Sequence, residues 1–175
     1  MEKVIFFENK NQHECLCSGD VYFDFLDYAF KCADYFMLVY VNYYGKGYSA
    51  IMKNFKKDLE SFRVKTRTNA SWPGTPATFC PNTTYKIVFY RTVPEAKAIL
   101  KRVKTLRGWS SPSYPQDLAF FKKNQCWFYS VGHENIAAII RATDNDFDFL
   151  ETKGLALGRN AQPLTEYYKA FDEEL

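Results

Sequence analysis

The sequence lacks any apolar run of the length, about 18 residues, that a membrane-spanning helix requires. Its longest stretch of mainly apolar residues, 35–44, is about half that length and contains Asn42. The first residues turn polar after four apolar side chains, which is too short a run for the core of a secretory signal. We therefore expect a cytoplasmic protein that has no membrane partner.

Histidine is scarce and the glycine-rich phosphate-binding motifs are absent, which argues against several classes of enzyme. The chain has two histidines and neither of the glycine-rich loops that cradle phosphates. His133 and Glu134 match the start of a zinc-protease motif, but Ala137 stands where the second histidine is needed. The other histidine, His13, precedes a Cys-x-Cys pair at 15–17, whose spacing is not that of structural zinc sites. We therefore predict no metal and no cofactor.

Cysteine occurs five times, at irregular spacings: Cys15, Cys17, Cys32, Cys80 and Cys126. Without a secretory signal, reduced and mostly buried thiols are the expected state. Cys80 or Cys126 beside His133 would form a nucleophile and its base. Packing as a small apolar side chain is the more common use of cysteine, and we favour it here.

The bulk composition is that of an ordinary folded domain. Hydrophobic residues make up 47% and charged residues 25% of the 175 residues. A chain of this length can bury about 70% of the surface that it exposes when unfolded. The aromatic share of 18% is high, and we expect most of the rings to lie in the core.

Hydrophobic periodicity divides the chain into strands and helices. Helices are predicted over 21–33, 48–61 and 144–153, and after the capping sequence Thr92–Glu95; strands are predicted over 3–7, 35–44, 62–68, 84–91, 125–131 and 135–141. Residues 117–122 fit either a short helix or a strand. The order predicts one α+β domain over 1–175, with a mixed or largely antiparallel sheet and about four helices. The second half is compatible with a ferredoxin-like element, and 155–175 form a tail of weak periodicity.

Charge is distributed unevenly along the chain. Residues 46–125 hold 16 basic and four acidic side chains, a net charge of +12, whereas the flanks hold seven basic and 16 acidic ones, a net charge of −9. A segment with such an excess of positive charge is a candidate surface for an anionic ligand. The acidic flanks could instead neutralise it by packing across it, or bind a second copy of the chain.

Two proline-rich loops carry the tryptophans Trp72 and Trp109, and the second loop also carries Tyr114. If the loops meet, these rings form an aromatic wall beside four basic residues. Those residues are Arg63, Arg67, Arg91 and Arg107. Such a wall can stack a ring while the cations hold a phosphate or carboxylate. The alternative is that the rings close the core beneath the loops.

The sequence favours a binding or interaction protein without a catalytic centre, a class that includes the neutralising and regulatory proteins common among small bacterial chains. Its partner would be an acidic protein surface or a nucleic acid. The residues predicted to bind it are Arg63, Arg67, Trp72, Arg91, Lys101, Arg102, Lys104, Arg107, Trp109 and Tyr114.

The alternative is an enzyme or small-molecule binder whose pocket uses the same loops. Asp117, His133 and Glu134 would then be its acid and base groups. In a third hypothesis the protein is a homo-oligomer, in which the acidic tail of one copy meets the basic centre of another.

Overall fold

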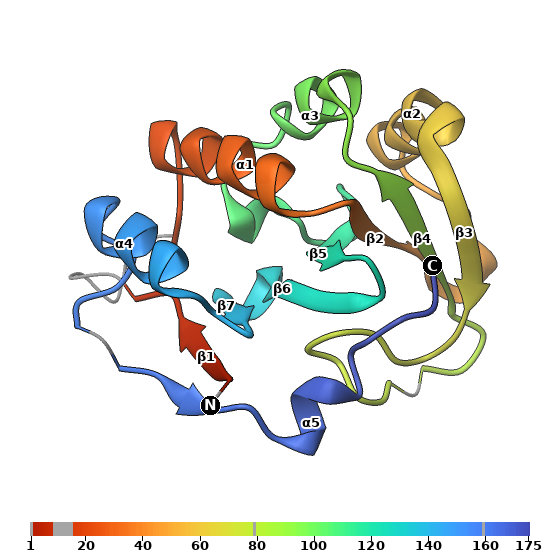
Figure 1. Ribbon diagram of the computed structural model, residues 1–175. Helices are drawn as coiled ribbons and strands as arrows, with labels where there is room; N and C mark the ends of the chain where they lie inside the picture. Colours follow the sequence, from red (N-terminus) through yellow and green to blue (C-terminus); the bar gives the residue numbers. More distant parts are fainter. Residues whose placement is uncertain (1, 9–15, 79, 159) are drawn as a thin grey trace.

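A computed structural model describes residues 2–8, 16–78, 80–158 and 160–175, and one antiparallel sheet organises them (Figure 1). Eight strands of the described chain form the sheet in the order β3-β4-β2-β5-β6-β7-β1-β8. Their bounds are Lys3–Phe6 (β1), Tyr35–Asn42 (β2), Arg63–Thr68 (β3), Thr84–Arg91 (β4), Gln116–Lys122 (β5), Gln125–Val131 (β6), Ile136–Ile140 (β7) and Gln162–Pro163 (β8). The predicted single α+β domain with a largely antiparallel sheet is confirmed. The ferredoxin-like element stays a prediction.

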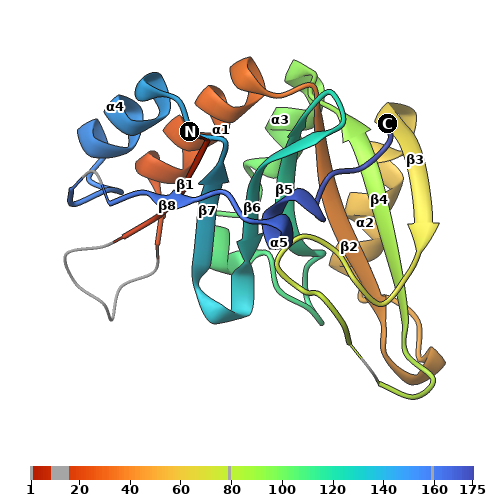
Figure 2. The same cartoon turned by 60° about the horizontal axis from the view of Figure 1, so that its bottom comes forward.

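The sheet has a helical face and a face covered by loops and the C-terminal segment. Helices α1 (Asp20–Cys32), α2 (Ala50–Leu59), α3 (Pro94–Leu100) and α4 (Asp144–Thr152) lie on the first face, and α5 (Glu166–Lys169) lies on the second (Figures 1 and 2). Because side chains alternate along a strand, β2 sends residues into both cores. Phe36, Leu38 and Tyr40 join the helical side, whereas Met37, Val39 and Val41 join the other. Most of the aromatic rings therefore fill these two cores, as expected.

Local capping explains where two of the helices begin. The Ser49 hydroxyl accepts a hydrogen bond from Met52 N at the start of α2. At α4, Thr143 N donates to the Asp146 carboxylate while Asp146 N donates to the Thr143 hydroxyl, and these two reciprocal bonds form a capping box. The capping box predicted at Thr92 is wrong, because its hydroxyl donates to Ala33 O instead.

A bulge in β3 changes which side chains share a face. The pairing with β4 shifts between Arg63 and Lys65, so the alternation expected across residues 62–68 is broken. Arg63 therefore faces the helical side, together with Thr66. Lys65 and Arg67 face the other side, where Arg67 lies over the ring of Phe89. Strict alternation along residues 62–68 predicts that Arg63, Lys65 and Arg67 form one basic face, and the bulge shows that this prediction is wrong.

Residues 117–122, which fitted either a helix or a strand, belong to β5. No helix in the described part of the chain is both long enough and apolar enough to cross a membrane.

Candidate anion-binding groove

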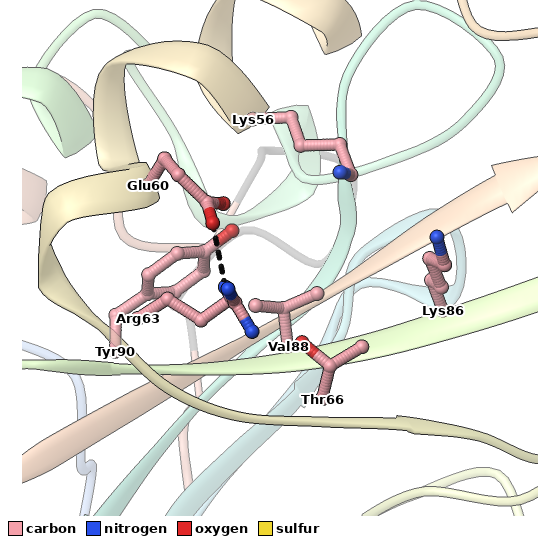
Figure 3. Close-up of a pocket in the computed structure, with 7 residues that line it drawn as sticks. All are labelled: Lys56, Glu60, Arg63, Thr66, Lys86, Val88 and Tyr90. Atoms are coloured by element: carbon pink, nitrogen blue, oxygen red, sulfur yellow. Dashed lines mark hydrogen bonds and ion pairs between the residues drawn. The ribbon is translucent and has the colours of Figure 1, made fainter.

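A cavity of about 250 Å³ lies between α2 and the β3–β4 edge of the sheet (Figure 3). Its lining residues are Lys56, Glu60, Arg63, Thr66, Lys86, Val88 and Tyr90. We call this cavity the α2–β3 groove. Its wall comes from α2 and the 3₁₀ turn that follows it, and its floor comes from alternate residues of β4 on the helical face of the sheet.

Three cations and one carboxylate line the groove. Arg63 Nε and Glu60 Oε1 form an ion pair of 2.8 Å at the groove wall. Lys56 and Lys86 form no ion pair with any described residue, and Lys86 is exposed. Lys53 and Lys57 line a second hollow beside it, together with Lys56 and Glu60. The groove therefore keeps an excess of positive charge that the described chain leaves unneutralised.

The floor of the groove also carries a buried phenol. The Tyr90 and Tyr40 hydroxyls are 2.7 Å apart, and burial raises the pKa of both, so both remain protonated. Two hydroxyls carry two protons, and the bond between them uses one. Tyr90 lines the floor of the groove but has no exposed surface, so this pair of hydroxyls belongs to the core beneath the groove.

Arg67, one of the predicted binding residues, and its neighbour Lys65 are instead held by the C-terminal segment. Lys65 Nζ lies 2.9 Å and Arg67 Nε lies 3.1 Å from the Glu173 carboxylate, and Lys65 also donates to Glu174 O. The acidic C-terminal flank thus neutralises part of the basic segment within the same chain, at Lys65 and Arg67. Self-association through the tail stays a prediction.

Removing the Glu173 charge is expected to weaken the fold. We expect Glu173→Gln to lower the free energy of unfolding by about 1–2 kcal/mol, because Lys65 and Arg67 lose the carboxylate charge and one of its two acceptor oxygens. Urea denaturation at low salt measures this change. Glu166→Gln is the control, since Glu166 is 88% exposed and should show no measurable loss. An equal effect of the two substitutions would contradict the assignment.

The predicted cations near α3 are also largely paired. Asp27 lies 2.9 Å from Lys97 and 3.1 Å from Lys101, and these cations lower the pKa of Asp27. Arg102 pairs with Asp58 at 2.6 Å. Lys104 donates to Lys101 O, which holds it near the backbone. Acidic side chains of α1 and α2 thus cover much of the charge on this surface.

The remaining predicted residues lie apart from the groove. Arg91 donates to Ser61 O, and Arg107 is exposed. Tyr114 is half-buried, with its ring against Phe55.

The expected aromatic wall does not form, because both indoles are buried on opposite faces of the sheet. Trp109 is fully buried in the helical core, where Nε1 donates to the Tyr22 hydroxyl. Trp72 is 3% exposed in the other core, and its Nε1 donates to Asp117 Oδ2. Both rings close the core, as the alternative interpretation of the sequence predicted.

The acid and base groups of the rival enzyme hypothesis are not arranged around the groove. Asp117 has no exposed surface, and it accepts hydrogen bonds from Trp72, Gln116 and Gly132. Burial raises its pKa, and these donors oppose the rise. His133 and Glu134 are more than half exposed and lie 3.7 Å apart. Asp117 therefore holds segments of the fold together.

The thiols of Cys80 and Cys126 form hydrogen bonds with groups other than His133. Cys126 is fully buried, its Sγ lies 3.5 Å from Phe128 O, and burial raises its pKa. The Cys80 thiol bonds to Tyr44 and Thr83. Across the described residues no three His, Cys, Asp or Glu side chains are grouped to hold a metal. His13 and Cys15, which the sequence analysis considered as metal ligands and rejected, lie outside the described residues.

Of the groove residues, the sequence singled out Arg63 alone as a binding residue. Lys56 was recognisable as a helix residue off the apolar stripe of α2, and Lys86 as a cation near the start of a predicted strand. Lys56 and Lys86 line the same groove because α2 packs beside β4, and no local sequence pattern predicts that packing.

Comparison with known proteins finds no matching family, no matching curated protein and no matching solved structure.

Proposed function

We propose that the protein is a cytoplasmic binding protein, without a catalytic centre, that holds an anionic partner in the α2–β3 groove. One observation carries the proposal: Lys56 and Lys86 line one groove and lack a carboxylate partner within the described chain. Arg63 lines the same groove, where it is paired with Glu60 (Figure 3). Most cations near α3 and on the other face of β3 have acidic partners of their own, whereas Lys104 donates to Lys101 O.

The size of the groove indicates what enters it. Its volume of about 250 Å³ is below the roughly 300–1,000 Å³ typical of sites for drug-sized ligands. A single carboxylate or phosphate group of a larger partner fits this space and meets Lys56, Arg63 and Lys86. The partner is therefore an acidic protein surface or a nucleic acid, rather than a free small molecule enclosed by the protein.

A salt titration tests this proposal. We expect labelled polyglutamate or a labelled oligonucleotide to bind at low salt, and log affinity to fall linearly with log salt concentration. Fluorescence anisotropy measures both quantities, and the slope reports the number of released counterions. Binding of neither probe at low salt, or binding that salt does not weaken, would contradict the proposal.

A further inference from the structure

The two edges of the sheet differ in how open they are. Strand β8 forms one edge, and it has two residues, one of which is Pro163. A short edge strand with proline offers little backbone for pairing. Strand β3 forms the other edge with six residues, and within the described chain β4 is its one strand neighbour (Figure 1). Its outer backbone donors and acceptors are therefore available to a further strand.

The positive charges along β3 determine which strands can pair with its open edge: they disfavour basic strands and favour acidic ones. On the helical face a second copy of β3 would bring another Arg63 beside a groove that already has an excess of positive charge, which is unfavourable; Lys65 and Arg67 lie on the other face and are paired with Glu173. An acidic strand has the complementary charge. The cations thus disfavour self-pairing and leave the edge open to an acidic partner.

We propose that the β3 edge binds an extended acidic segment of a partner protein as an added strand, with acidic side chains at alternate positions directed toward the α2–β3 groove. This inference rests on the proposed function and specifies its partner as a protein. Backbone hydrogen bonds to β3 would supply affinity, and the groove would supply selectivity for acidic side chains.

Strand geometry gives the segment a pattern. Six residues of β3 span about 20 Å, and an added strand lies about 4.8 Å beyond them. Every second side chain of that strand shares the helical face with Arg63 and Thr66, near Lys56 and Lys86. On the opposite face Lys65 and Arg67 already bind Glu173, which would repel a further carboxylate. The favoured segment therefore alternates acidic with uncharged residues.

Synthetic peptides test the proposal on the intact protein. One heptapeptide alternates Thr and Glu, and another has the same composition with its Glu residues consecutive. We expect the alternating peptide to bind at least about tenfold more tightly by fluorescence anisotropy. It should also slow amide hydrogen exchange at residues 63–68. Equal affinities together with unchanged exchange in β3 would overturn the proposal.

Backbone methylation separates strand addition from simple charge attraction. Two versions of the alternating peptide carry N-methyl groups at the Glu positions or at the Thr positions. In a strand, one of these sets faces β3 and the other faces solvent. We expect one version to lose at least about tenfold in affinity and the other to bind as the parent does, which also reveals the direction of the added strand.

The outcomes distinguish this inference from the proposed function. If both methylated peptides bind as the parent does, and Lys56→Glu with Lys86→Glu still abolishes binding, the groove binds anions but strand addition is refuted. Binding of an oligonucleotide with no binding of any acidic peptide would overturn the inference in favour of nucleic acid. A stable dimer of the free protein in sedimentation, with residues 63–68 protected from exchange, would assign the edge to a second copy.

Discussion

Asp117→Asn is expected to lower the free energy of unfolding by about 3 kcal/mol, the largest effect that we predict for a single isosteric substitution. Asp117 Oδ2 accepts from Trp72 Nε1 at 2.8 Å and from Gln116 Nε2 at 3.3 Å, while Oδ1 accepts from Gly132 N at 3.0 Å. Asparagine has one acceptor oxygen, so its amide NH₂ must face one of these buried donors. Each buried donor left without a partner costs about 1–3 kcal/mol.

The surroundings of Asp117 cannot relax to recover the lost bond. A Cβ atom at Gly132 would lie 2.2 Å from Trp109 O, so the turn at Gly132 already packs against the backbone of the preceding loop. The backbone of Asp117 has a φ of 58°, a conformation that asparagine also tolerates. The substitution therefore tests the hydrogen bonds without adding backbone strain.

Chemical denaturation measures the loss, with Asp58→Asn as the control. Asp58 accepts from Arg102 on the surface, where an ion pair is worth less than about 1 kcal/mol. A loss at Asp117 no larger than that at Asp58 would show that the buried carboxylate does not hold these segments together.

The double charge reversal Lys56→Glu with Lys86→Glu is expected to weaken binding of polyglutamate at low salt by at least about 100-fold. It removes two cations that line the groove and places two carboxylates beside Glu60. Like charges in a shared site raise the cost of bringing in another anion, and this cost is largest where salt screening is weakest.

A matched reversal elsewhere controls for net charge. Lys31 and Lys123 are exposed and lie outside the groove, so Lys31→Glu with Lys123→Glu changes net charge by the same amount. We expect this control to weaken binding by less than about fivefold through the long-range field. Equal losses in the two double variants would mean that the probe responds to net charge and not to the groove.

Strands were easier to predict from sequence than the surface they build. Residues 84–91 and 125–131 form strands with the predicted bounds, because β-branched and aromatic residues there are bounded by turn-forming ones. The cap at Thr143 was also predictable, since its partner Asp146 is three residues away. Such signals are local, and the fold class followed from them.

The candidate site depended on contacts that no local pattern encodes. Lys65 meets Glu173 across more than a hundred residues, and this pairing decides which cations remain free. One bulge moved Arg63 to the face opposite Lys65, although strict alternation predicted otherwise. The loop sequences left open whether Trp72 and Trp109 form a binding surface or close the core, and both indole N–H groups donate to buried acceptors.

Lysine labelling of the protein with and without bound polyglutamate shows whether the α2–β3 groove is the binding site, because it locates the anion on the surface. Mass spectrometry after brief acetylation reports the reactivity of each lysine. We predict that Lys56 and Lys86 lose reactivity when the probe binds, whereas Lys31 and Lys123 do not. Protection centred on Lys97, Lys101 and Lys104, with Lys56 and Lys86 unchanged, would contradict the assignment of the α2–β3 groove as the binding site.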